Sequence, residues 1–476
     1  MAAPARQVVI ADDLTGAVES TAALAGLGPD GGEAAIVALD LPTLAQAGTA
    51  IAACDLNCRN LAAAEAAERL SAAMTVALDW AGSAGGRLKK IDSLWRGNTV
   101  AEVAALARRG PAVLVPALPE LDRTVTGGRL RRPAAAGGEL DLTACLAGVV
   151  VPVELRVVRS SGAVLAAQLR AIWGLGRLPL LDSVSADDLD RIVAVLADWP
   201  DRLVIGCGGV AAALGRRRAA QRLGLTEPDG PTQWSDGTGP DGADQWSDAP
   251  DSGGPAQWSA RLELDGVAEA GGRPVAILVG SAEPRAREQI RRLAELGYPV
   301  ETVDPAEAVE LAETVGPVET GDAAETGGLV GAVGPVAGTA GTDPAAACAW
   351  PVPVRVFTSL EPAPDQGLDD GQAARAVVAR ALAWRPAADC VATGGSTARA
   401  LVEALGLAWL RPLVQVHPGA VVSLAGDGRL VATRPGSFGQ LDSLAAMLQG
   451  VHRLRGASSG DPTVPDAPNL PTVPVD

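Results

Sequence analysis

The sequence contains few of the side chains that catalyse hydrolysis or bind transition metals. It has only two histidines, His417 and His452, and six cysteines that form no CxxC pair. A zinc site or a Ser-His-Asp triad needs positioned imidazoles or closely spaced thiolates. We therefore expect no metal-ligating residues and no hydrolase of that type, and we interpret the cysteines as reduced, buried thiols.

An excess of positive charge and long apolar runs are also missing. The formal net charge is -17 at pH 7. Nucleic acids and anionic membranes would repel such a chain at long range, so we expect neither as a partner. The sequence has no run of eighteen apolar residues and no signal-peptide pattern at its start, which leads us to expect a cytoplasmic protein.

Lysine is nearly absent. Lys89 and Lys90 are the only lysines among the 39 lysine and arginine residues. Two adjacent lysines in such a chain indicate either a need for a compact ammonium group or chance placement on a solvated turn. The two interpretations are about equal until the neighbouring residues are considered.

Apolar residues are plentiful, and their arrangement predicts the fold class. They make up 48% of the 476 residues, enough for two or three domains with full cores. Apolar runs alternate with amphipathic, alanine-rich segments, which predicts two Rossmann-like α/β domains with mainly parallel sheets. The first domain is expected over 1–225 and the second over 261–455. Low complexity predicts a linker over 226–260, a disordered insertion over 312–349 and a disordered tail over 456–476.

The first strand and helix are separated by two adjacent carboxylates. The segment VVIADDLTGA (8–17) indicates a strand, an acidic loop with Asp12 and Asp13, and a helix. One carboxylate suffices to cap a helix. The second favours a ligand contact, because ligands bind at the carboxyl ends of the strands in open α/β sheets.

A second charged loop follows a later strand. The segment KKIDSLWRGN (89–98) places Lys90, Asp92 and Arg96 close together, and Arg59 follows an earlier apolar run. Such charges form either a weak surface network or a cradle for a carboxylate and hydroxyls.

Glycine-rich turns mark the second domain. The turn TGGST (393–397) precedes a helical pattern, and RPGSFG (434–439) places a similar turn beside a cation. Helix N-termini of this kind suit phosphate oxygens, although the lysine of a Walker A loop is missing and an ordinary capped helix is the alternative. Residues 206–211 also match a dinucleotide loop, which we interpret as a tight strand-to-helix turn rather than an NAD site.

Taken together, the motifs resemble the four-carbon acid sugar kinase family. The segments that carry this resemblance occur in the family's order: VVIADDLTGA, KKIDSLWRGN, VPALPELDRT, LLDSVSADDL, VGSAEPRAREQI, TGGSTARALVEALGL and RPGSFG. The resemblance implies a sugar-acid domain followed by a nucleotide domain that uses ATP and Mg²⁺. It implies catalytic roles for Asp12 and Asp13 and substrate binding by Arg59, Lys90, Asp92 and Arg96. It implies nucleotide binding by Ser281, Gly394, Gly395, Ser396, Thr397, Gly436 and Gly439.

The function expected from this resemblance is ATP-dependent, in-line phosphorylation of a hydroxyl on a small four-carbon sugar acid. Asp13 is the first choice for the base. The alternative is a non-catalytic relative that binds a sugar acid or nucleotide and acts as a sensor or partner protein. The expected partner is the small-molecule sugar acid, and a homodimer is left open.

Overall fold

The computed structural model describes residues 5–28, 32–83, 85–199, 201–224, 273–280, 284–304, 352–359, 370–436 and 438–456. The predicted linker (226–260) and insertion (312–349) lie outside the described residues, as does the predicted tail (456–476) apart from Gly456. We refer to residues 5–224 as the N-terminal half and to the described residues from 273 onward as the C-terminal half.

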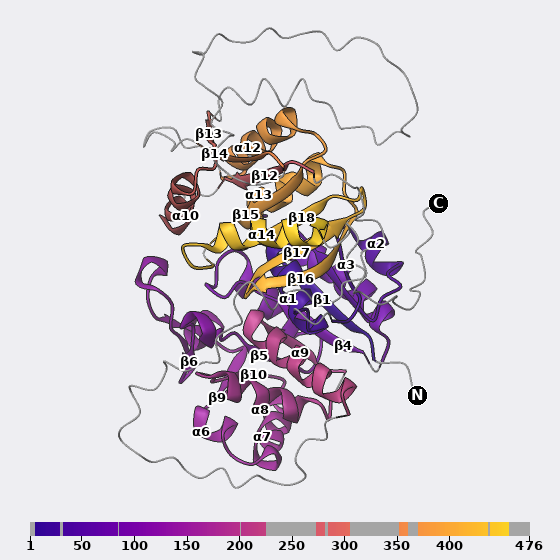
Figure 1. Ribbon diagram of the computed structural model, residues 1–476. Coiled ribbons are helices and arrows are strands. Elements are labelled where there is room, and N and C mark those ends of the chain that lie inside the picture. The colour runs from indigo at the N-terminus through magenta and orange to yellow at the C-terminus, as the bar shows by residue number, and fades with distance from the viewer. Residues whose placement is uncertain are drawn as a thin grey trace, which may run out of the picture.

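Strands from both halves join in one large sheet (Figure 1). In the described part of the chain its order is β13-β14-β12-β15-β18-β17-β16-β2-β3-β1-β4-β11-β5-β10-β9. The N-terminal half supplies β1 (Gln7–Ala11), β2 (Ala35–Ala38), β3 (Ile51–Asp55), β4 (Gly86–Lys90), β5 (Ala112–Val115), β9 (Val150–Val153), β10 (Leu178–Leu181) and β11 (Leu203–Gly206). The C-terminal half supplies β12 (Val275–Val279), β13 (Val300–Val303), β14 (Val354–Ser359), β15 (Asp389–Thr393), β16 (Trp409–His417), β17 (Ala420–Ala425) and β18 (Leu430–Arg434). The predicted α/β fold with mainly parallel strands is confirmed.

Helices cover both faces of this sheet. In the N-terminal half they are α1 (Leu14–Ala25), α2 (Leu41–Ala45), α3 (Ala63–Ala81), α4 (Thr99–Ala107), α5 (Leu142–Cys145), α6 (Leu155–Val158), α7 (Gly162–Gly174), α8 (Ala186–Leu196) and α9 (Gly208–Arg222). In the C-terminal half they are α10 (Pro284–Glu295), α12 (Asp370–Trp384), α13 (Gly395–Ala404) and α14 (Ser443–Gly456). A small separate sheet contains β6 (Val125–Thr126), β7 (Arg129–Leu130) and β8 (Leu140–Asp141). None of the helices in the described ranges has the length and apolar character needed to cross a membrane.

The two halves meet through one antiparallel strand pair that the sequence did not predict. Trp409 and Leu410 of β16 pair with Ala38 and Val37 of β2. In the strand order of the sheet, the parallel strands of the N-terminal half therefore run in the opposite direction to those of the C-terminal half. Sheets twist by about 20–25° per neighbouring pair, so the six pairs between β1 and β15 accumulate roughly 120–150°. This rotation offsets the reversal and turns the carboxyl ends of both strand sets toward a common space.

Helix α1 lies where the halves meet and contacts β3 of one half and β16 of the other. Asp13 caps its N-terminus by accepting a hydrogen bond from the Gly16 amide at 3.0 Å. Its alanine-rich surface lets neighbours approach closely: a Cβ on Gly215 of α9 would lie only 1.9 Å from the Ala23 carbonyl oxygen. The loop between β1 and α1 is thereby fixed at the junction.

Strand β4 sends its two lysines to opposite faces of the sheet, as strand geometry requires. Lys89 is fully buried and its Nζ lies 3.0 Å from Glu102 Oε2 of α4. Lys90 faces α1, with its Nζ 3.7 Å from Glu19 Oε2. The adjacent lysines therefore have separate buried partners and do not form a solvated turn.

We expect Lys89→Met to lower the free energy of unfolding by about 3–5 kcal/mol, because it leaves Glu102 buried without a counter-charge. Urea denaturation at pH 7 measures this loss. The double variant Lys89→Met/Glu102→Leu should recover most of it, since it removes both buried charges. As a matched control, Arg69→Met breaks an exposed pair with Glu65 and should cost less than about 1 kcal/mol. A similarly small loss for Lys89→Met would contradict the expectation.

Candidate functional site

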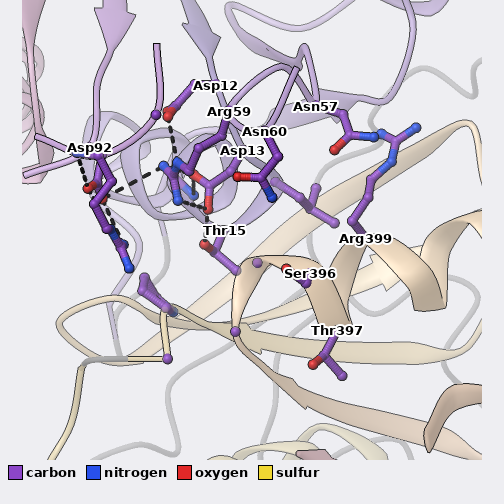
Figure 2. Close-up of a pocket in the computed structure, with 18 of the residues that line it drawn as sticks. Asp12, Asp13, Thr15, Asn57, Arg59, Asn60, Asp92, Ser396, Thr397 and Arg399 are labelled. Atoms are coloured by element: carbon purple, nitrogen blue, oxygen red, sulfur yellow. Dashed lines mark hydrogen bonds and ion pairs between the residues drawn. The ribbon is translucent and has the colours of Figure 1, made fainter. Parts of the chain in front are cut away.

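A cleft of about 770 Å³ lies between the two halves (Figure 2). Loops after β1, β3 and β4 line it from the N-terminal half, and turns after β12, β15 and β18 line it from the C-terminal half. The residues expected from the sequence that line it are Asp12, Asp13, Arg59, Lys90, Asp92, Arg96, Gly394, Gly395, Ser396, Thr397 and Gly436. Gly439 is not among the lining residues, and Ser281 lies outside the described residues.

Arg59 links the carboxylates of two loops. Its Nε donates to Asp12 Oδ2 at 2.7 Å, and its Nη1 donates to Asp13 Oδ2 at 3.0 Å. Its Nη2 also lies 2.9 Å from Asp13 Oδ1 and 3.8 Å from Asp92 Oδ1. Figure 2 shows the guanidinium between these three acids. Burial would lower the pKa of Arg59, but the aspartates raise it well above its usual value, so the side chain is held as a cation.

The backbone of the loop that carries Arg59 is held in place by Asn98 and Gly97 of the loop after β4. The Asn98 side-chain amide donates to the Cys58 carbonyl at 3.0 Å and to the Leu61 carbonyl at 2.8 Å. Gly97 has a φ of 68°, and a Cβ there would lie 2.7 Å from the Arg59 carbonyl oxygen. Only glycine fits this close approach of the two loops.

The hydrogen bonds distinguish the two adjacent aspartates. Asp13 also accepts from Thr15 Oγ1 at 2.7 Å and from the Gly16 amide, so with Arg59 its carboxylate lone pairs are fully used. Asp12 Oδ1 is buried and has no hydrogen-bond partner. Burial would raise the pKa of Asp12, but Arg59 and Lys89 hold it below its usual value.

The other cations expected from the sequence are also paired. Arg96 makes a bidentate contact with Asp92, with Nε to Oδ2 at 2.7 Å and Nη2 to Oδ1 at 2.9 Å. Burial would raise the pKa of Asp92, but Arg96 and Arg59 hold it far below its usual range. Among the described residues, the ion pair recorded for Lys90 is its longer contact to Glu19, and Lys90 also lines the cleft.

Glu19 also lies against the turn that resembles a dinucleotide loop. A Cβ on Gly208, at the start of α9, would lie 2.3 Å from Glu19 Oε1. Glu19 of α1 therefore packs directly against Gly208 of this turn. This packing supports the interpretation of residues 206–211 as a tight strand-to-helix turn.

The C-terminal half presents the N-terminus of α13 to the cleft. Gly394 precedes the helix with a φ of 93°, and no side chain caps the helix. The amides of Gly395, Ser396 and Thr397 stand in the first turn, where the helix offers them no carbonyl partner. Such free amides and the helix dipole favour an anion.

Two further turns support α13. Thr397 is buried, and its Oγ1 accepts a hydrogen bond from the Gly280 amide at 3.2 Å, so its side chain holds the turn after β12. Gly436 lies at the cleft surface. Gly439 has a φ of 85° and packs behind it, where a Cβ would lie 2.8 Å from Arg434 Nη1.

The halves touch one another inside the cleft. A Cβ on Gly395 would lie 2.7 Å from Asp13 Oδ2, so the turn before α13 directly abuts the acidic loop. Arg399 of α13 reaches across to Asp55, with Nη1 3.1 Å from Oδ2. Burial raises the pKa of Asp55 to about 6, against the opposing effect of Arg399.

Sequence reasoning did not assign Arg399 or Arg375 to the site. Arg375 is an exposed residue of α12 that lines the cleft, and it has no recorded carboxylate partner among the described residues. Both arginines belong to alanine-rich helical patterns in a chain whose cations are nearly all arginine. Nothing in the local pattern separates them from surface arginines.

Within the described residues, no three histidine, cysteine, aspartate or glutamate side chains are grouped so as to hold a metal ion. The carboxylates nearest the α13 turn are already engaged by Arg59, apart from Asp12 Oδ1.

We expect the stability difference between the wild type and Asp55→Asn to depend on pH. The folded pKa of about 6 exceeds the ordinary value of 3.8, so folding favours the protonated carboxyl. The stabilisation is complete below about pH 4 and is lost as the pH rises through 6. Relative to Asp55→Asn, the wild type should lose about 2 kcal/mol between pH 4 and pH 7, as measured by urea denaturation. A difference that stays constant over this range would contradict the assigned environment of Asp55.

Two different protein families match the N-terminal and the C-terminal half of the chain. Residues 7–141 match a family described as a sugar-binding N-terminal domain, and residues 352–444 match one described as a nucleotide-binding C-terminal domain. The chain is 32% identical over 232 residues to a D-threonate kinase of Cupriavidus necator, which covers 44% of this chain and 53% of that protein. The alignment thus spans about half the length of this curated relative.

Two crystal structures share the fold. A putative tRNA synthase from Salmonella typhimurium superposes with a TM-score of 0.64 at 19% identity, covering 94% of this chain and 99% of that one. A Haemophilus influenzae protein superposes with a TM-score of 0.57 at 17% identity, covering 93% and 99%. The two domain matches, in this order, and the similarity to a D-threonate kinase support the resemblance of the sequence motifs to the four-carbon acid sugar kinase family.

Proposed function

We propose that this protein is a kinase that transfers the terminal phosphoryl group of ATP to a hydroxyl of a small four-carbon sugar acid. The observation that carries the proposal is the direct contact between the acidic loop and the turn before α13, where Asp13 meets Gly395. An acceptor bound at the acidic loop and a phosphate bound at the helix N-terminus would be neighbours there. The relative in Cupriavidus necator is named for phosphorylating a compound of this class, D-threonate.

The acceptor side of the cleft supplies groups of both signs. Lys90 can donate to a carboxylate or hydroxyl of the acid, since its contact with Glu19 is long. Asp12 lines the cleft and its buried Oδ1 has no hydrogen-bond partner among the described residues, so we assign to this carboxylate the role of orienting the hydroxyl and taking its proton. Asp13, the first choice from the sequence, instead caps α1 and holds Arg59. This division of roles follows from the hydrogen bonds of the two carboxylates.

The donor side supplies amides and a cation. The first-turn amides of α13 would bind phosphate oxygens, and Arg375 would add positive charge beside them. Mg²⁺ would arrive as part of the Mg-ATP substrate, since phosphates supply most of its ligands in such sites. In-line transfer then needs alignment and charge neutralisation rather than a covalent intermediate. Closure of the two halves around the substrates would exclude water, which would limit hydrolysis of ATP.

The proposal is tested by incubating the purified protein with Mg-ATP and a panel of three- to five-carbon hydroxy acids that includes D-threonate. We expect ADP release that depends on a four-carbon acid. ATP binding without acid-dependent ADP release would instead support the non-catalytic sensor.

Asp12→Asn should lower kcat by about a hundredfold or more, because a general base contributes at least that factor. The KM for ATP should change little, since Asp12 lies on the acceptor side. Asp13→Asn, which keeps a residue able to cap the helix, should lower kcat less than Asp12→Asn does. Steady-state kinetics with the best acid of the panel measure both. The reverse order of effects would return the role of base to Asp13.

Arg375→Gln should raise the KM for ATP by about tenfold with little change in the KM for the acid, because one charged hydrogen bond to phosphate is lost. Arg380→Gln on the same helix is the matched control, since Arg380 pairs with Glu301 away from the cleft. If both variants leave the KM for ATP unchanged, Arg375 does not contact the nucleotide.

A further inference from the structure

Arg434, at the carboxyl end of β18, is a fully buried cation without a carboxylate partner among the described residues. Arg455, another buried arginine of the same half, shows the usual arrangement. Its Nε lies 2.8 Å from Asp389 Oδ2 at the opposite end of β15. A buried charge normally needs such a partner, because leaving water costs several kcal/mol. The exception at Arg434 therefore requires an explanation.

The Arg434 guanidinium connects three elements that surround the turn before α13. Nη2 donates to Thr393 Oγ1 at 2.6 Å and to Gln289 Oε1 of α10 at 2.8 Å. Nη1 donates to the Phe438 carbonyl oxygen in the turn after β18. Its own carbonyl accepts from the Gly394 amide at 2.9 Å. One side chain thus fixes the ends of β15 and β18 and the start of the second turn.

Neutral acceptors satisfy these hydrogen bonds but do not balance the charge. Arg434 Nε is buried and has no partner. Burial lowers the pKa of Arg434 to about 10, which still leaves the group charged at neutral pH. The adjacent N-terminus of α13 adds further positive potential. The fold therefore concentrates positive charge behind Thr393 and Gly394, and the carboxylate that abuts this turn, that of Asp13, is already paired with Arg59.

We propose that Arg434 is the positioning residue of the nucleotide site: it holds the two glycine-rich turns together, and phosphate bound at α13 supplies its missing counter-charge. The inference rests on the proposed function and deepens it. Arg434 does not line the cleft, so it acts through Thr393, Gly394 and Phe438 rather than by touching the nucleotide. The charge acts over a short distance in a region of low dielectric, where screening is weak.

The test compares Arg434→Met and Arg434→Lys with the wild type, using Mg-ADP as the probe. Titration calorimetry gives the Kd for Mg-ADP, and thermal unfolding gives Tm with and without it. Without nucleotide, Arg434→Met should lower Tm by only a few degrees, since removing an unbalanced buried charge offsets part of the loss of its three hydrogen bonds. Its Kd for Mg-ADP should be weaker by about tenfold or more, and the Tm increase caused by Mg-ADP should shrink accordingly.

Arg434→Lys keeps the charge but cannot reach all three acceptors, so its Kd for Mg-ADP should weaken by about threefold to tenfold. Arg455→Lys is the matched control. It should lower Tm and leave the Kd for Mg-ADP within about twofold of the wild type.

Four outcomes would overturn the inference. An Arg434→Met protein with a lower Tm and an unchanged Kd for Mg-ADP would give Arg434 a purely structural role. If Arg434→Met does not fold, a wild-type Kd in Arg434→Lys decides against the inference. Wild-type protein that binds no Mg-ADP would remove the proposed function itself, whereas binding that is insensitive to both Arg434 variants removes only the inference.

Discussion

The guanidinium of Arg59 neutralises carboxylates that would otherwise repel one another at the ends of β1 and β4. Asp12, Asp13 and Asp92 converge there because parallel strands end at a common edge of the sheet. Without a central cation, at least one of these buried acids would have to protonate or leave the cluster. The placement of Arg59 by Gly97 therefore determines the acceptor side of the cleft, including the unpartnered oxygen of Asp12.

The cleft also depends on close packing at the junction of the two halves, which glycine residues permit. Gly395 meets Asp13 where no larger residue fits, and Gly215 lets α9 pack against α1. The cations differ in their partners. Arg59, Arg96 and Arg399 contact carboxylates, whereas Arg375 and Arg434 of the C-terminal half have no recorded carboxylate partner among the described residues.

Local sequence patterns were sufficient for much of the fold. The alternation of apolar runs and alanine-rich segments predicted the α/β class, and the acidic loop and the TGGST turn were each placed correctly between a strand and a helix. The pattern could not assign partners. Lys89 and Lys90 are adjacent in sequence, yet strand geometry sends one to Glu102 and the other to Glu19. Arg399 and Arg375 resemble surface arginines until the halves are brought together.

The sequence by itself determined the strand, loop and helix units, because hydrophobic period and glycine-rich turns are local properties. It also placed chemistry-bearing residues at the ends of strands, where parallel sheets expose them. Only the tertiary structure decided that β2 pairs with β16, that Asp13 serves as the cap while Asp12 keeps a free oxygen, and that Arg434 is buried without a counter-charge. These features depend on contacts between residues far apart in the chain, and no local pattern encodes which distant groups will meet.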